Sequence, residues 1–189
     1  MEPSDGNLVG TVTVGQEMTM QFYFTVNEEC GSSWCNVIQV GDSWNIRLPG
    51  IFVKGVPNQF EVTMTDNEDW TNAQMINSED FEVVPDGEEH FFYFRYTANE
   101  RVYAIDDVEV YREECNATTS CSFNNSDYHG IHSVYMNPPW TTPPMNMTIR
   151  DLRISDGVIT TAPTEQPTVE PTSDPTTRYN IRSSFQQNA

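Results

Sequence analysis

The sequence predicts an all-β sandwich made of two antiparallel sheets. Short segments rich in aromatic and β-branched residues recur along the chain, and several alternate strictly between apolar and polar residues. No segment longer than about ten residues repeats apolar residues at helical spacing. Glycine, proline and aspartate separate the segments, so we expect around ten to twelve short strands. They should form a single domain that spans residues 1–157.

The clearest element is a long hairpin over residues 89–112, and the other strands are expected to pack around it. Both arms are rich in aromatic and β-branched residues, and a four-residue polar break, residues 97–100, separates them. In the second arm, Asp106 and Asp107 interrupt the alternation. We expect a turn at these two aspartates, after which the strand resumes.

Further strands are expected on both sides of this hairpin. Residues 18–26 show the cleanest alternation and predict a half-buried strand, with Met18, Phe22 and Val26 on its apolar face. Residues 66–78 are polar and irregular, so they are expected to form a loop that carries a few core anchors. The other expected strands are residues 8–14, 36–40, 43–48, 51–53, 59–65, 81–84, 130–136 and 147–154.

The chain is strongly acidic, with 28 aspartate and glutamate residues against 9 lysine and arginine residues and a net charge of −19. Such a charge repels the phosphate backbone of nucleic acids and the surface of anionic membranes, and we expect neither as a partner. No apolar run is long enough to form a transmembrane helix. An acidic surface keeps a protein soluble and can also hold divalent cations, so charge alone locates no site.

Several features indicate a secreted protein, although the first residues lack the basic and apolar regions of a signal peptide. Four cysteines, three Asn-x-Ser/Thr sequons and a tail rich in proline and threonine are typical of the secretory route. We therefore expect a mature or internal fragment of an extracellular, cell-surface glycoprotein. N-glycans are predicted at the sequon asparagines, Asn116, Asn124 and Asn146.

The four cysteines lie in two close pairs and allow three connectivities. Proximity along the chain favours two local disulfides, which would join Cys30 to Cys35 and Cys115 to Cys121. Zinc is the alternative, but the spacing of the cysteines and the histidines fits no common zinc finger or ribbon. The histidines are His90, His129 and His132.

Three pieces of the chain, in this order, resemble the concanavalin A-like lectin and laminin-G superfamily. They are residues 18–26 with 36–40, the hairpin that ends in Tyr103-Ala-Ile-Asp-Asp107, and the closing residues 149–154. Family members commonly have a Tyr-x-Asp-Gly turn at the end of that hairpin. The resemblance covers roughly residues 7–156 and implies a jelly-roll sandwich. This superfamily includes sugar binders, calcium-dependent adhesion modules, glycanases and inert spacers, so the fold does not by itself define the function.

The sequence can be compared with the catalytic motif that a glycanase activity requires. Similar β-glucanases carry a strand motif Glu-x-Asp-x-x-Glu, because a retaining mechanism needs two carboxylates about 5 Å apart. Residues 104–109 are the nearest match and keep Asp106 and Glu109, but Ala104 stands at the nucleophile position. No other nucleophile motif is present in the sequence. We therefore expect a protein that is not an enzyme and has no cofactor.

Sugar binding needs an aromatic platform beside polar groups, and Ca²⁺ binding needs several converging oxygen ligands. Tryptophans are the candidate platforms, although tryptophans in a sandwich are more often part of the core. Residues 66–69 or Asp106 and Asp107 could supply oxygen ligands for Ca²⁺, but acidic turn residues are usually only solvated, so a metal site stays open. The tryptophans are Trp34, Trp44, Trp70 and Trp140.

The tail contains a proline-threonine repeat with a period of four residues. Proline favours polyproline II, in which a four-residue step turns successive units by about 120° and would place threonine-linked sugars on all sides. Similar repeats in algal and protist surface proteins look like O-glycosylated stalks, sometimes with hydroxylated proline, and residues 158–177 are expected to form such a stalk. The threonines are Thr164, Thr168, Thr172 and Thr176, and the prolines are Pro163, Pro167, Pro171 and Pro175.

Residues 178–189 follow the stalk and regain apolar side chains at Tyr179, Ile181 and Phe185. They are expected to dock on a neighbouring copy, so that subunits join head to tail into an open helical polymer. The leading interpretation is therefore a structural subunit of an extracellular filament or cell-surface appendage. The alternative is a carbohydrate-binding or adhesion module carried on a mucin-like stalk.

Overall fold

The computed structural model describes residues 8–43, 46–66, 69–114, 129–136 and 143–157, and in residues 65–80 it describes the backbone alone. Eleven strands lie in these residues. None of the described residues belongs to a helix long and apolar enough to cross a membrane.

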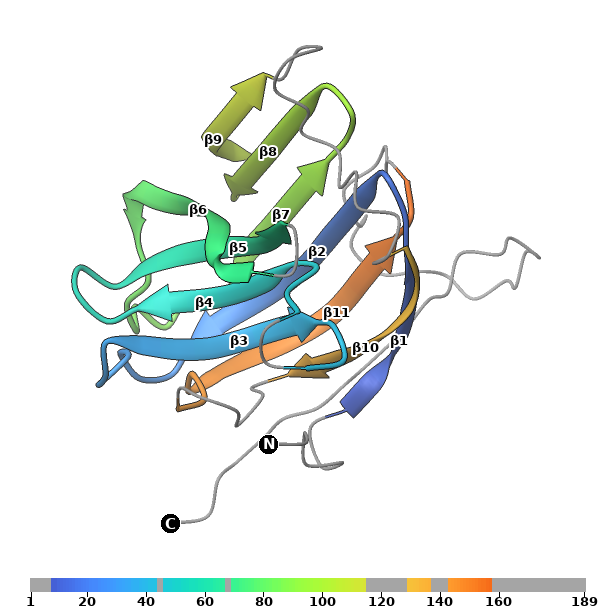
Figure 1. The fold of residues 1–189 in the computed structure, drawn as a ribbon. Coiled ribbons are helices and arrows are strands. Elements are labelled where there is room, and N and C mark those ends of the chain that lie inside the picture. Colours follow the sequence, from blue (N-terminus) through green and yellow to red (C-terminus); the bar gives the residue numbers. More distant parts are fainter. Residues whose placement is uncertain (1–7, 44–45, 67–68, 115–128, 137–142, 158–189) are drawn as a thin grey trace, which may run out of the picture.

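The strands form two antiparallel sheets that lie face to face (Figure 1). Sheet A has the strand order β1 (Leu8–Val14), β10 (Gly130–Met136), β3 (Trp34–Val40), β4 (Gly50–Lys54), β5 (Gln59–Asp66) and β6 (Asp69–Glu82). Sheet B has the order β11 (Met147–Ser155), β2 (Met18–Val26), β7 (His90–Tyr96), β8 (Glu100–Ile105) and β9 (Val108–Glu114). Strands from the two ends of the chain pair with each other in both sheets, as in a jelly roll. The predicted all-β sandwich is confirmed.

The core lies between the sheets and is rich in aromatic rings. Phe22 of β2 stacks on Phe92 of β7 with ring centroids 4.6 Å apart. Phe60 of β5 meets Phe24 of β2 edge-on at 5.1 Å and so joins sheet A to sheet B. These four side chains are at most 1% exposed. Such ring pairs stabilise a core beyond the apolar area that they bury.

Strand β2 has the alternation that the sequence predicts. Met18, Phe22 and Val26 point into the core and are at most 3% exposed. Thr19 and Gln21 lie on the outer face of sheet B, yet they are buried as well. Because β2 is paired with a strand on each side, its outer face is flanked by the side chains of β11 and β7.

The predicted strand at residues 43–48 is wrong for those of its residues that are described. They form a loop between β3 and β4. The side-chain amide of Gln39 donates hydrogen bonds to the carbonyls of Ser43 at 2.7 Å and Ile46 at 2.8 Å. A side chain therefore satisfies the backbone carbonyls that a neighbouring strand would otherwise pair.

The predicted loop at residues 66–78 is also wrong, because most of it belongs to β6, a strand of 14 residues. The pairing of β6 with β5 is irregular, with register shifts between Gln59 and Glu61 and between Met64 and Asp66. β6 is the last strand of sheet A and pairs on one side only. A polar sequence suits such an edge strand, which is why the local pattern does not reveal it.

The predicted hairpin is present as β7 and β8, with residues 92–96 paired to residues 101–105. The chain then turns at Asp106 and Asp107, whose φ angles are 52° and 62°, and returns as β9. Two successive residues with positive φ are typical of a type I′ hairpin turn. The predicted turn at the two aspartates is confirmed, but the chain reverses there, so residues 108–114 form a separate strand paired with β8 rather than the continuation of the second arm.

Candidate ligand-binding pocket

A short cysteine loop, residues 30–35, leads into β3 and is closed by a disulfide. The Cα atoms of Cys30 and Cys35 lie 5.8 Å apart and their sulfurs are bonded, as the sequence predicts. The hydroxyl of Ser32 lies 3.7 Å from the sulfur of Cys30 and donates a hydrogen bond to the carbonyl of Trp34 at 2.5 Å. The disulfide and this hydroxyl together hold the path of the loop.

The cysteine loop packs against the turn that follows β4. The amide of Gly55 donates a hydrogen bond to the carbonyl of Ser33 at 3.1 Å. A Cβ atom at Gly55 would lie 1.8 Å from the carbonyl oxygen of Ser32, which is far inside van der Waals contact. Two backbones therefore approach each other here at a distance that only glycine permits.

An open pocket of about 590 Å³ lies between the cysteine loop and this turn. Trp34 and Lys54 line it from neighbouring strands, because they are cross-strand partners in the pairing of β3 with β4. The ammonium of Lys54 lies 5.8 Å from the centroid of the Trp34 ring, a distance at which a cation and an indole attract each other. The remaining lining residues are Cys30, Gly31, Ser32, Ser33, Gly55 and Val56.

Lys54 also interacts with a buried carboxylate in sheet A. Glu61 of β5 is 3% exposed. Burial raises the pKa of Glu61 to about 7, although the charges of Lys54 and Arg47 counteract the shift. The guanidinium of Arg47 lies 4.7 Å from the ring centroid of Phe52. The carboxyl group of Glu61 therefore changes its charge near neutral pH, and its electrostatic attraction to Lys54 of the pocket changes with it.

The residues that resemble a glycanase motif do not lie on one strand. Ala104 is on β8 and Glu109 is on β9, and Asp106 lies in the turn between them. Oδ2 of Asp106 contacts Nδ1 of His90 at 2.6 Å. Glu109 accepts hydrogen bonds from the guanidinium of Arg112, the shortest at 2.7 Å. Each carboxylate is therefore engaged by a protein side chain.

Asp106 is also one of the residues predicted as a calcium ligand. Its Oδ1 accepts a hydrogen bond from the backbone N–H of Phe91 at 2.7 Å, so both oxygens of its carboxylate have protein partners. Among the described residues, no group of three or more His, Cys, Asp or Glu side chains is arranged to hold a metal ion. Asp107, the second candidate ligand of this turn, is exposed, and the side chains of residues 66–69 lie outside the described residues.

Two further predicted site residues lie within the described ranges. Trp34 is the candidate platform whose side chain is described, and it lines the pocket rather than the core. Asn146, a predicted glycosylation site, is exposed immediately before β11. Its side-chain oxygen accepts a hydrogen bond from the Asn27 amide at 3.3 Å. An exposed asparagine in this position is accessible to glycosylation.

The other predicted sites lie outside the described residues. They belong to the second cysteine pair, two sequons, two of the candidate tryptophans, the proline-threonine stalk and the C-terminal docking segment. The filament prediction depends on that last segment and stays a prediction. The residues are Cys115, Cys121, Asn116, Asn124, Trp44, Trp140, Thr164, Thr168, Thr172, Thr176, Pro163, Pro167, Pro171, Pro175, Tyr179, Ile181 and Phe185.

Sequence analysis singled out only Cys30 and Trp34 of the pocket residues; the turn after β4, with Lys54, Gly55 and Val56, was among those it missed. The local signal for them is weak, since Gly55 followed by Pro57 marks a turn and nothing more. Lys54 becomes a pocket residue only because strand pairing sets it beside Trp34.

The two sheets and their jelly-roll connections define an antiparallel β-sandwich domain, and the open pocket lies at one end of strands β3 and β4. No protein-family model matches the chain, and no curated protein matches it. A structure of botulinum neurotoxin type C matches with a TM-score of 0.52 and 14% identity over 77% of this chain and 33% of that chain. Cell entry of that toxin depends on interaction with two ganglioside molecules. The binding domain of botulinum neurotoxin DC in complex with SialylT matches with a TM-score of 0.53 and 12% identity over 75% of this chain and 32% of that chain.

Chicken galectin 2 matches with a TM-score of 0.47 and 9% identity over 79% of this chain and 96% of that chain. The chain spans about a third of the length of the two toxin chains. At these identities, the similarity to the toxins shows a shared fold and nothing about the ligand.

Proposed function

We propose that this chain is a carbohydrate-binding or adhesion module of an extracellular glycoprotein, and that the pocket at Trp34 holds the sugar. The observation that carries this proposal is an indole that lines an open pocket beside the ammonium of Lys54. The apolar face of a pyranose stacks on an indole, while sugar hydroxyls accept hydrogen bonds from an ammonium and pair with a serine hydroxyl such as that of Ser33. The volume, about 590 Å³, is in the range of small-molecule sites.

Two further observations support this function. The disulfide between Cys30 and Cys35 fixes the loop that lines the pocket, so little ordering remains to be done when a ligand binds. Disulfides persist mainly in secreted proteins, which agrees with an extracellular role. Cell entry of the similar type C toxin depends on interaction with ganglioside molecules, so a protein that contains this fold uses glycan recognition.

Binding to a glycan array tests the proposal. We expect the protein to bind a restricted set of glycans, and Trp34→Ala to weaken that binding at least about tenfold because the stacking surface is lost. Ile131→Ala is the matched control, since it also truncates a large side chain outside the core, 73% exposed on β10 and absent from the pocket lining. Equal binding by Trp34→Ala and Ile131→Ala, or no binding by the wild type, would contradict the assignment.

The module is further proposed to be non-catalytic and to need no cofactor. Ala104 cannot act as a nucleophile, and the nearby carboxylates of Asp106 and Glu109 are engaged by His90 and Arg112. Incubation with β-glucans, followed by measurement of new reducing ends, tests the first statement. Glycan binding before and after EDTA treatment tests the second. Reducing ends above those of a heat-inactivated sample, or binding lost with EDTA, would refute the respective statement.

A further inference from the structure

The outer face of sheet B carries a row of side chains that crosses all five strands. Strand pairing places Arg153 of β11 beside Gln21 of β2, and Gln21 beside Tyr93 of β7. It then places Tyr93 beside Ala104 of β8, and Ala104 beside Glu109 of β9. Cross-strand partners share a face of the sheet, so these side chains form one surface. It belongs to the sheet that does not carry the pocket at Trp34.

Gln21 in this row has a buried amide without a partner. The side chain is 1% exposed, and neither its Nε2 nor its Oε1 makes a hydrogen bond with any residue that the structure describes. Buried side-chain amides are nearly always paired. An amide offers two donor hydrogens and a carbonyl acceptor, so Gln21 has the groups to pair with a hydroxyl of a ligand.

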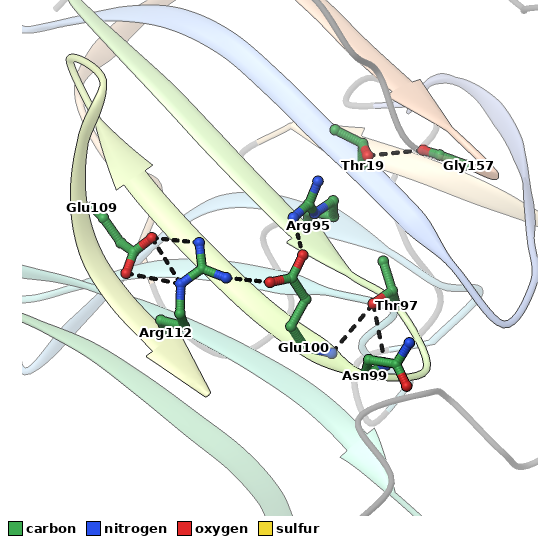
Figure 2. A network of polar contacts seen from close by, with 8 residues as sticks. All are labelled: Thr19, Arg95, Thr97, Asn99, Glu100, Glu109, Arg112 and Gly157. Atoms are coloured by element: carbon green, nitrogen blue, oxygen red, sulfur yellow. Dashed lines mark hydrogen bonds and ion pairs between the residues drawn. The ribbon is translucent and has the colours of Figure 1, made fainter. Parts of the chain in front are cut away.

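Arg153 differs from the other arginines on this face. Three of the others form ion pairs with carboxylates. Arg95 pairs with Glu100, and Arg112 pairs with Glu100 and Glu109 (Figure 2). Arg150 pairs with Glu89 and Asp151. The guanidinium of Arg153 makes no ion pair or hydrogen bond within the described part of the chain. In a chain with a net charge of −19, an unpaired guanidinium beside an unpaired amide favours a ligand that carries an anionic group.

The next two positions of the row suit a sugar ring. Tyr93 is half-buried and presents an aromatic ring beside the Gln21 amide. Ala104 follows it across the sheet, and its single methyl group leaves space above the strand. An aromatic ring next to a small residue provides a flat surface on which the apolar face of a pyranose can lie.

We propose that this row is a binding site for a sugar acid, a pyranose that carries a carboxylate. The carboxylate pairs with the guanidinium of Arg153 in the two-pronged geometry that arginine favours, a neighbouring hydroxyl pairs with the amide of Gln21, and the ring lies on Tyr93. Arg153 is partly buried on an outer strand of sheet B, and because Gln21 is 1% exposed in the free protein, ligand binding requires that neighbouring side chains of this face move aside. This site does not depend on the pocket at Trp34 and stands without it.

Titration with sodium glucuronate tests this inference, with NMR detection of the side-chain ¹⁵N–H signals of Gln21. We expect these signals to shift saturably with glucuronate. Glucose lacks the carboxylate and acetate lacks the sugar ring, so each should bind at least about fivefold more weakly. Unshifted Gln21 signals would show that the amide has another partner, such as a resident water, and would overturn the proposal. An equal response to acetate would reduce the site to a general anion site and overturn the sugar assignment.

Glucuronate binding by three variants tests which side chains the proposed site requires. Arg153→Met should weaken glucuronate binding about tenfold or more. Arg150→Met is the matched control, because Arg150 is on the same strand and face but is already paired with Glu89 and Asp151, and its affinity should stay within about twofold. Trp34→Ala should leave glucuronate binding unchanged, so that failure of the pocket and failure of this row are told apart. Full affinity in Arg153→Met would refute the role of the guanidinium.

Discussion

Nδ1 of His90 lies 2.6 Å from Oδ2 of Asp106, and this contact ties the start of β7 to the turn between β8 and β9. On the other side of the ring, Nε2 lies 2.9 Å from Oδ2 of Asp86. A neutral imidazole has one donor, whereas the imidazolium has two, so two flanking carboxylates favour the charged form. Burial by itself lowers the pKa of His90, but the hydrogen bonds with Asp106 and Asp86 outweigh it and raise the pKa above the ordinary value.

The His90 contact predicts that the protein becomes less stable in mild alkali. Because the pKa of His90 is raised in the folded state, its contribution is fully present below the unfolded pKa of about 6.5 and is lost as the pH rises through the folded pKa. Urea unfolding of the wild type across this range should show a falling free energy of unfolding. His90→Gln should lack that part of the decrease, while His129→Gln, the control, should keep it. Identical profiles for the two variants would contradict the prediction.

Glu61 predicts a second pH dependence, in a lower window. Its pKa is raised from 4.5 to about 7 in the folded state, so the folded protein binds this proton more tightly than the unfolded chain. Its contribution to stability therefore falls as the pH rises from about 4.5 to about 7, by roughly 3 kcal/mol, and levels off above that range. Urea unfolding of Glu61→Gln should lack this loss. The exposed Glu88→Gln should keep it, and a Glu88→Gln profile that matches Glu61→Gln would count against the prediction.

The turn at Asp107 predicts a stabilising substitution. Its φ of 62° lies in the left-handed region, which costs residues with a Cβ atom more than glycine. Asp107→Gly should raise the free energy of unfolding by roughly 0.5 kcal/mol, as measured by denaturant titration. Asp107→Ala should lower it, because alanine has neither the freedom of glycine nor the side chain of aspartate. A destabilised Asp107→Gly would show that the aspartate makes a contact that outweighs its backbone conformation.

Removal of the disulfide should weaken both stability and sugar binding. Replacing Cys30 and Cys35 together by serine should lower the free energy of unfolding by about 2 kcal/mol, since the loop loses its covalent closure. Calorimetry should also show weaker binding of the sugar identified on the glycan array, because the loop lines the proposed pocket. Unchanged affinity in the double variant would mean that the pocket does not depend on the disulfide. Trp34→Ala, by comparison, should lose affinity with little loss of stability.

Two buried glutamines should respond in opposite ways to the same substitution. Gln39 donates hydrogen bonds to two backbone carbonyls, so Gln39→Met should destabilise by about 1–3 kcal/mol because those carbonyls lose their partner. The amide of Gln21 has no partner within the described residues, so Gln21→Met should be neutral or stabilise by about 1 kcal/mol. Thermal unfolding of both variants measures the difference. Equal destabilisation would mean that Gln21 is bonded in solution.

Several elements could be predicted because their signals are local. The alternation of residues 18–26 marks β2, since a strand with one face in the core repeats every two residues. Asp106 and Asp107 mark a turn because aspartate tolerates positive φ. Cys30 and Cys35 are close in the sequence, so their pairing follows from proximity. In each case, a few neighbouring residues contain the whole signal.

Other elements depend on neighbours that are distant in the sequence. Residues 69–82 form a strand because β5 offers them a free edge, and nothing in their own polar pattern requires it. Part of the segment 43–48 remains a loop because the Gln39 side chain binds its carbonyls. Both outcomes follow from backbone hydrogen bonding, which any sequence can provide once the partner is in place.

The sites are the part of this protein that only the tertiary structure decides. Composition, alternation and the spacing of Cys30 and Cys35 are enough to predict a β-sandwich with a local disulfide. They do not specify the register that sets Lys54 beside Trp34, or the crossover that brings Arg153 beside Gln21 from the far end of the domain. Backbone hydrogen bonds between strands have nearly the same geometry whatever the side chains, so no local sequence pattern reveals which polar residues meet. Burial in the core selects the fold, and the meeting of these side chains on its surface follows from that selection.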